Sequence, residues 1–140
     1  MLGGVLHHVA SYIIDFAERM TKLCAFNPVI PVRDMAAALA YYTERLGFRK
    51  SFDDASGPDG VPSYAGVCRD GLCLHLQTIG PDEAPTMPLI RIEVQDIEAL
   101  HDEYQAQGIV ASPLAAKPWG TKDFGVYDLN KAALVFYEVP

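Results

Sequence analysis

Apolar and polar residues alternate along several short segments of this chain, as they do in strands with one buried face. The clearest alternation runs through 72–77, where leucines occupy every second position and Cys73, His75 and Gln77 take the others. A second alternation, at 89–94, places Ile90, Ile92 and Val94 on one face and Leu89, Arg91 and Glu93 on the other. Both segments predict strands that bury one side only.

Two longer segments carry apolar residues at helical spacing instead. The first, 35–46, follows Asp34 and ends before Gly47, and the second follows Asp96 and ends at Gly108. Aspartate is a preferred residue at a helix N-terminus, and glycine commonly ends a helix. Mixed strands and helices of this kind predict an α+β fold.

The two helices belong to two copies of one longer unit. Asp34 and Asp96 are 62 residues apart, as are Tyr42 and Tyr104, and His75 precedes Val135 by 60 residues. Self-similarity at a fixed long period indicates a duplicated structural unit. Each copy also offers three further strand segments; we expect these at 48–53, 61–67, 72–78, 109–112, 123–127 and 132–139.

These elements predict one domain of two tandem βαβββ modules over residues 26–140. The modules are 26–79 and 88–140, joined by a proline-rich linker. Residues 1–25 form an N-terminal extension with apolar residues near a 3.6-residue period. The extension is either an amphipathic helix or an appendage outside the fold. No Lys or Arg precedes Arg19, so a secretory signal is not predicted.

The two faces of the predicted strands differ in whether a helix covers them. An amphipathic helix buries its apolar side, so the helices cover the face that carries Leu74 and Ile92. The opposite face, which carries His75, Arg91 and Glu93, is left without a helix. Either a binding site or an ordinary solvated sheet face fits this pattern.

The arrangement resembles the vicinal-oxygen-chelate superfamily, which includes glyoxalase I, extradiol dioxygenases and bleomycin-resistance proteins. The resemblance rests on 28–34, on Tyr41-Tyr42 before 46–48, and on Lys117-Pro-Trp-Gly120 leading into Phe124 and 128–131. The last segment is most similar to the bleomycin-resistance branch, although Lys131 stands where the family commonly has glycine. The resemblance implies that the modules form a curved mixed sheet around a cavity, with the helices on the outer face. It also implies a homodimer.

Metal-using members of the superfamily hold their metal at four strand positions. Transferred to this sequence, those positions are Asn27, His75, Leu89 and Val135. Leucine and valine cannot coordinate a metal, and asparagine is a poor ligand for a transition metal. The resemblance therefore implies no metal site and no cofactor.

The composition of the chain limits the classes of molecule that we expect it to bind. The formal net charge is −7, and no Lys/Arg-rich run is present, which argues against nucleic acid. No apolar run is long enough to span a membrane. The chain has three cysteines, Cys24, Cys68 and Cys73, which is an odd number without a CxxC spacing. We therefore expect reduced thiols in the cytoplasm and no disulfide framework.

Together these features favour a protein that binds and sequesters a bulky, cationic aromatic compound without a chemical step. The alternatives are an enzyme of the superfamily, either with an incomplete metal site or with His75 as a base, and a small-molecule sensor. No catalytic triad, phosphate loop or dinucleotide fingerprint is present. The predicted ligand-binding residues are Asn27, His75, Arg91, Glu93, Trp119, Tyr137, Tyr64 and Phe124.

Overall fold

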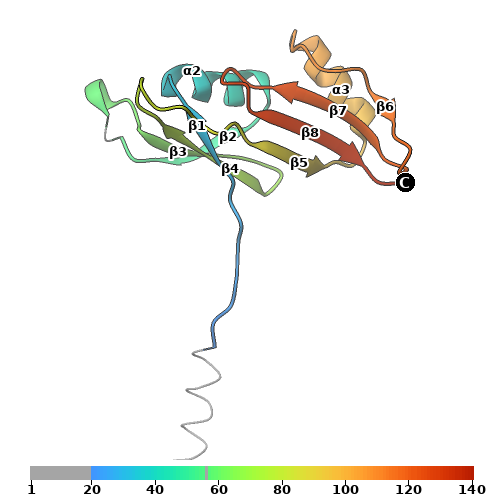
Figure 1. The fold of residues 1–140 in the computed structure, drawn as a ribbon, viewed down its shortest axis with the longest axis horizontal. Helices are drawn as coiled ribbons and strands as arrows, with labels where there is room; N and C mark the ends of the chain where they lie inside the picture. Colours follow the sequence, from blue (N-terminus) through green and yellow to red (C-terminus); the bar gives the residue numbers. More distant parts are fainter. Residues whose placement is uncertain (1–19, 56) are drawn as a thin grey trace, which may run out of the picture.

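A computed structural model describes residues 20–55 and 57–140 and contains two successive modules (Figure 1). The elements of the first module are β1 (Val29–Val32), α2 (Met35–Ala40), the π-helical segment η1 (Tyr41–Arg45), β2 (Arg49–Asp53), the 3₁₀ turn η2 (Pro58–Gly60), β3 (Tyr64–Arg69) and β4 (Leu72–Thr78). Those of the second are β5 (Leu89–Glu93), α3 (Ile97–Ala106), β6 (Ala115–Ala116), β7 (Lys122–Tyr127) and β8 (Ala133–Glu138). The predicted helix at the N-terminus falls mostly on residues 1–19, outside the described residues.

Each module builds its own four-stranded mixed sheet. The strand orders are β1-β4-β3-β2 and β5-β8-β7-β6. In each sheet the first strand pairs in parallel with the last strand of its module, through Val29↔His75 in one and Arg91↔Val135 in the other. These two pairs are equivalent under the sequence offsets of 62 and 60, so the predicted α+β duplication is confirmed.

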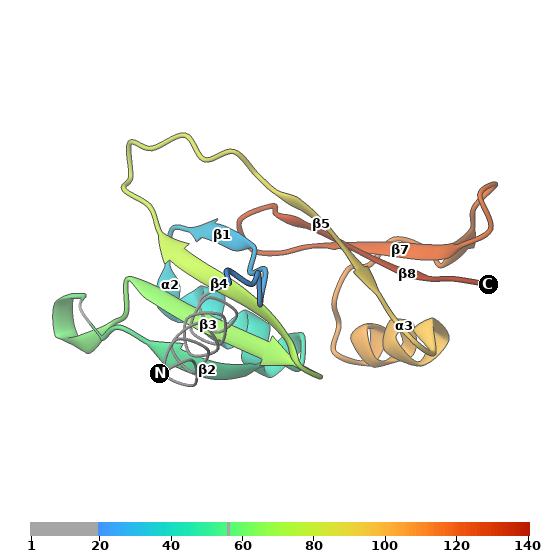
Figure 2. The same ribbon diagram turned by 90° about the horizontal axis from the view of Figure 1, so that it is seen from below.

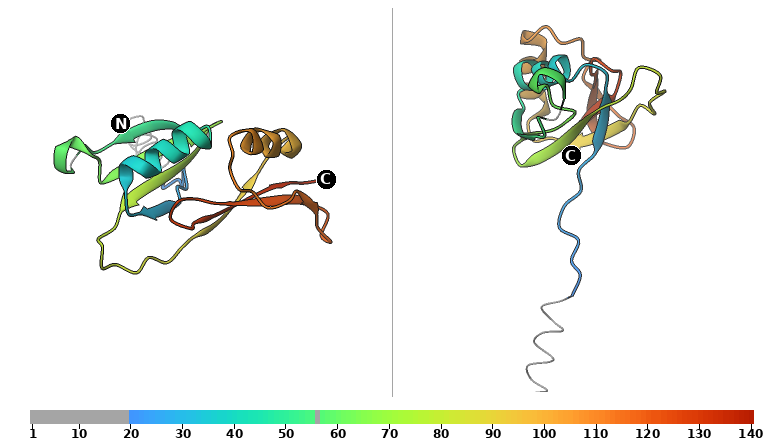
Figure 3. Two further views of the ribbon diagram at one scale, coloured as in Figure 1. Left: turned by 90° about the horizontal axis from the view of Figure 1, so that it is seen from above. Right: turned by 90° about the vertical axis from the view of Figure 1, so that its left-hand side faces the viewer.

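The helices of both modules lie on the same side of the two sheets. Figure 1 shows α2 and α3 on the upper side of the strands. The view from above shows α2 in front of the first sheet and α3 beside β7 and β8, and the view from below shows β3 and β4 in front of α2 (Figures 2 and 3). Strand residues that face the helices are buried, among them Ile30, Leu74 and Leu76. Within residues 20–55 and 57–140, no helix covers the other face of either sheet, as the alternation predicted.

The two predicted helix starts are confirmed. Asp34 accepts a hydrogen bond from the Ala37 backbone N–H at 3.0 Å, and Asp96 accepts one from the Ala99 N–H at 3.4 Å. Each carboxylate replaces an intrahelical partner that the first turn lacks. The expected strand at 109–112 was wrong: only an isolated bridge joins Ala111 to Val126 there. The Ser112 hydroxyl accepts the Gly125 N–H at 2.8 Å, so a side chain takes the place of a backbone ladder bond.

Side chains join the two modules on the helix side. The buried Tyr42 hydroxyl donates to Asp128 at 2.9 Å, and the hydroxyl of its repeat equivalent, Tyr104, donates to the Leu46 carbonyl at 3.0 Å. Arg69 donates to both carboxylate oxygens of Glu103 at 2.7 and 2.8 Å. This hydrogen bonding lowers the pKa of Glu103, whereas burial raises the pKa values of Tyr42 and Tyr104. The contacts are reciprocal, since each module's tyrosine bonds to the other module.

Candidate functional site

A groove of about 1030 Å³ lies between the modules, on the side of β4 and β5. The first module supplies the segment before β1 and the β3–β4 turn, and the second supplies Pro88 and most of β5. The lining side chains are mainly apolar, and several are well exposed; these are Phe26, Val29, Leu72 and Leu89. The lining includes Asn27 and Arg91, two predicted site residues from opposite modules, and the acidic Asp70 of the β3–β4 turn.

An aromatic cluster on the open face of the first sheet adjoins the groove. His75 is the register partner of Val29, which lines the groove. The Phe52 and Tyr64 rings are stacked at 6.1 Å, and each meets the His75 ring edge-on, at 5.1 and 5.4 Å. All three rings are partly or fully accessible, so the cluster offers aromatic surface to a ligand.

Gly66 makes room for this cluster. A Cβ at this position would lie 2.2 Å from Cε1 of Phe52, closer than two carbon atoms can approach. Phe52 therefore lies directly across the backbone of β3, opposite Gly66 in the register. Any larger residue at position 66 would push the ring away from Tyr64 and His75.

His75 is oriented by a hydrogen bond. Its Nδ1 lies 2.8 Å from the Tyr64 hydroxyl. When the hydroxyl donates, Nε2 carries the ring proton and can donate to a ligand; when Nδ1–H donates, Nε2 is free to accept a proton. The contact therefore fixes the ring and leaves Nε2 as its reactive atom.

A polar cluster lies on the open face of the second sheet. The Arg91 guanidinium lies over the Tyr137 ring, 4.5 Å from its centroid. Its Nη1 is 3.3 Å from Oδ2 of Asp123, and Oδ1 of Asp123 accepts the Thr121 hydroxyl at 2.5 Å. Asp123 is only 5% exposed. The structure thus brings Arg91 and Tyr137 together and adds two residues, Asp123 and Thr121, that the sequence analysis did not include.

The remaining predicted residues lie elsewhere. Glu93 lines a smaller cavity of about 610 Å³ between the modules. Trp119 is 65% exposed and belongs to the connection between β6 and β7. Figure 1 shows this connection at the end of the second module far from the first. Phe124 requires a correction, because its ring is 2% exposed and packs against Phe136 and Tyr104 in the core. It faces the helices with Val126 and does not line the open face.

Two of the four transferred positions, His75 and Val135, occupy equivalent places in β4 and β8. Leu89 begins β5 and is 65% exposed, whereas Asn27 precedes β1. Among the described residues, no three His, Cys, Asp or Glu side chains are arranged to hold a metal ion. Likewise, no helix in the described ranges has the length and hydrophobicity needed to cross a bilayer.

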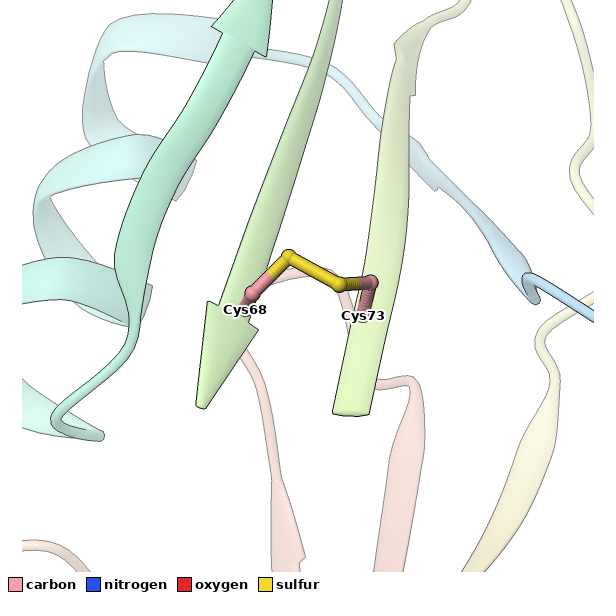
Figure 4. Close-up of a disulfide and its surroundings, with 2 residues drawn as sticks. All are labelled: Cys68 and Cys73. Carbon is pink, nitrogen blue, oxygen red and sulfur yellow. A yellow bond between two sulfur atoms is a disulfide. The ribbon is translucent and has the colours of Figure 1, made fainter. Parts of the chain in front are cut away.

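Cys68 and Cys73 form a disulfide across the β3–β4 hairpin (Figure 4). The expectation of three reduced thiols was therefore wrong for this pair. The turn at Asp70-Gly71 sets the two cysteines directly opposite each other in the register, with Cα atoms 4.1 Å apart. Cys24 is free and exposed. The expected cytoplasmic location loses the support of reduced cysteines, because disulfides persist mainly in oxidising compartments.

Reduction of this disulfide is expected to lower the free energy of unfolding by about 2 kcal/mol, without unfolding the protein. The bridge closes a short loop, and the entropy that it removes from the unfolded chain grows with loop length. Urea titration with and without a phosphine reductant measures the difference. Cys24→Ser is the matched control and should respond to the reductant as the original protein does. An equal stability under both conditions would show that the bridge contributes nothing in solution.

Comparisons with known proteins agree on one family. The model of the Glyoxalase/Bleomycin resistance protein/Dioxygenase superfamily matches residues 6–136. No curated protein sequence matches the chain. A glyoxalase-related enzyme from Clostridium phytofermentans is similar in structure, with a TM-score of 0.73 and 20% identity, covering 87% of this chain and 99% of that one.

Two structures connected with bleomycin binding or resistance are also similar. The bleomycin-binding protein of Streptomyces verticillus, in complex with copper(II)-bleomycin, is 26% identical with a TM-score of 0.62, covering 86% of this chain and 98% of that chain. A transposon-encoded bleomycin resistance determinant is 20% identical with a TM-score of 0.70, and the match covers 84% of this chain and 98% of that chain. The two-module fold is therefore shared with proteins of this kind.

Proposed function

Because this chain belongs to the Glyoxalase/Bleomycin resistance protein/Dioxygenase superfamily, we propose that it binds and sequesters a bulky aromatic small molecule in the groove between its modules. The groove itself carries the proposal. Its volume of about 1030 Å³ suits a large ligand, and its lining is apolar with a few polar groups. The accessible rings of Phe52, Tyr64 and His75 next to the groove provide stacking surface for an aromatic group.

The charge of the protein favours a ligand that is cationic overall. A formal net charge of −7 attracts positive molecules at long range and raises their association rate at low salt. The proposal includes no metal, cofactor or chemical step. The cellular compartment stays a prediction, with the cytoplasm as the original expectation.

The proposed assembly is a homodimer. The apolar lining of the groove is exposed, with Phe26 at 87% and Leu89 at 65%, and we propose that a second copy closes the groove from outside and leaves room for the ligand. In such a dimer, Trp119 reaches the ligand from the partner copy, because in its own chain it lies far from the groove. Trp119, Asn27, His75, Arg91, Glu93, Tyr64 and Tyr137 remain proposed ligand-binding residues, and Phe124 is left out.

Titration with bleomycin, with and without copper(II), tests this function. Phe52→Ala is expected to weaken binding by about 2 kcal/mol, because a stacking ring in a desolvated site is removed. Trp119→Ala should weaken it to a similar extent, because the 65% exposed indole is the ring that we propose stacks on the ligand from the partner copy. Calorimetry measures both, and sedimentation gives the assembly state. Val110→Ala is the control, because this 92% exposed side chain lies outside the groove. No heat at millimolar bleomycin would rule out this ligand class.

A second candidate function is catalysis with His75 as the base. The Tyr64 hydroxyl, 2.8 Å from Nδ1, favours it because the contact leaves Nε2 available for proton transfer. Mass and NMR spectra of the ligand recovered from the complex in D2O separate the two functions. Unchanged spectra support sequestration, whereas a change in structure or deuterium content that requires His75 supports an enzyme.

A further inference from the structure

The Arg91 guanidinium is held from two directions by its own sheet. β5, β8 and β7 are neighbours, and the register pairs Tyr137 of β8 with both Glu93 and Asp123. Tyr137 covers one face of the guanidinium at 4.5 Å, and Asp123 accepts from Nη1 at 3.3 Å. Long arginine side chains usually lose considerable entropy when a ligand orders them. Here the protein has ordered the side chain in advance.

Asp123 holds the Arg91 guanidinium in its position. It is 5% exposed, although it lies on the sheet face that neither α2 nor α3 covers. A buried carboxylate is stabilised only by a partner of opposite charge and by hydrogen bonds to its remaining oxygens. Arg91 supplies the charge, and the Thr121 hydroxyl, at 2.5 Å, binds the other oxygen. The carboxylate is thereby fixed, and it fixes the guanidinium in turn.

Most of the N–H groups of Arg91 have no hydrogen-bond acceptor among the described residues and can bind a ligand in the groove. A guanidinium has five N–H groups, and the contact with Asp123 is the one hydrogen bond that the described residues give it. Its side chain is 43% exposed and lines the groove together with apolar residues such as Leu89. The planar fork of donors matches the two oxygens of a carboxylate.

We propose that Arg91 forms a carboxylate-binding subsite of the groove, with Asp123 and Thr121 as positioning residues. The inference rests on the proposed small-molecule function and adds to it the class of ligand: an aromatic or apolar body that bears a carboxylate. Arg91 and Asp123 together carry no net charge. The subsite therefore selects by the geometry of the donors, while the charge of the whole protein acts at longer range.

Three naphthalene compounds of similar shape test the subsite: 2-naphthoate, its neutral 2-carboxamide and the cationic 2-naphthylmethylamine. The original protein should bind the naphthoate about tenfold or more tightly than the other two, as a charge-assisted, bidentate contact provides. Arg91→Lys keeps the charge beside Asp123 but loses the fork, and should bind naphthoate about tenfold more weakly. Arg49→Gln is the control, because this exposed arginine lies on β2 outside the groove.

Two further variants distinguish the loss of the Arg91 contact from misfolding and from a change in charge alone. Arg91→Gln combined with Asp123→Asn leaves no buried unpaired carboxylate, and it should bind naphthoate and carboxamide equally. Asp123→Asn alone removes a negative charge, which by electrostatics would raise the preference for naphthoate. If Asp123 positions Arg91, that preference falls instead. A preference that rises or stays constant would overturn the positioning role.

The outcomes separate this inference from the proposed function. If bleomycin binds but no variant of Arg91 changes the naphthoate preference, the subsite is wrong and the binding function stands. If naphthoate binding depends on Arg91 while bleomycin does not bind, the subsite stands and the bleomycin-like function fails. Failure to bind naphthoate at millimolar concentration would overturn the subsite.

Discussion

Replacing Asp128 with alanine is expected to lower the free energy of unfolding by about 4 kcal/mol. The Asp128 side chain is 6% exposed and accepts three hydrogen bonds. Oδ1 binds the N–H groups of Asn130 and Ala132 at 2.8 and 2.9 Å, and Oδ2 binds the Tyr42 hydroxyl of the other module at 2.9 Å. Alanine would leave three donors without acceptors, and each buried orphan costs about 1–3 kcal/mol.

Urea denaturation followed by circular dichroism measures this loss. Tyr42→Phe is the matched control, because it removes the contact between the modules and leaves the turn intact. It should cost about 1 kcal/mol, the usual contribution of one hydrogen bond. Should both variants lose the same free energy, the turn around Asp128 would not depend on its carboxylate.

Replacing Phe124 with alanine is expected to cost a similar amount, about 4 kcal/mol. The ring is stacked on Phe136 at 5.2 Å and meets His101 edge-on at 4.9 Å, so its removal opens a large cavity in the core. Phe124→Leu retains most of the volume and should cost less than about 1.5 kcal/mol. Thermal unfolding of the three proteins gives the comparison.

Binding measurements on the same variants separate a core role from a ligand role. Phe124→Leu should bind bleomycin or naphthoate with the affinity of the original protein, since the ring does not reach the groove. A leucine variant with full stability and weakened ligand binding would contradict the core assignment.

The duplicated fold could be predicted from local pattern because both modules keep the same capping residues and strand alternation. Asp34 and Asp96 occupy equivalent helix starts, and the alternation around His75 correctly separated the buried from the open face. The disulfide was not predicted, although the sequence carries a signal for it. Two cysteines placed symmetrically about the Asp70-Gly71 turn face each other in any two-residue hairpin.

The site was less predictable because it depends on contacts between strands. Phe52 reaches His75 only because the register shifts between Lys50 and Phe52 and because Gly66 has no side chain. Asp123 looks like an ordinary solvated residue until Arg91 of β5 is placed beside it. Phe124 shares its face with the apolar Val126, and that alternation was a signal for the core that its aromatic character obscured.

The way the modules are joined has a consequence for the motions of the protein. No strand pairing connects the two sheets within the described ranges, and the hydrogen bonds between modules involve side chains such as Tyr42, Tyr104 and Arg69. The modules can therefore separate slightly while every backbone ladder bond stays closed. In hydrogen-exchange terms, a small widening of the groove would leave the amides of both sheets protected, because it breaks no ladder hydrogen bond. Such a widening would change the contacts between side chains of the two modules and leave the backbone hydrogen bonds of both sheets intact.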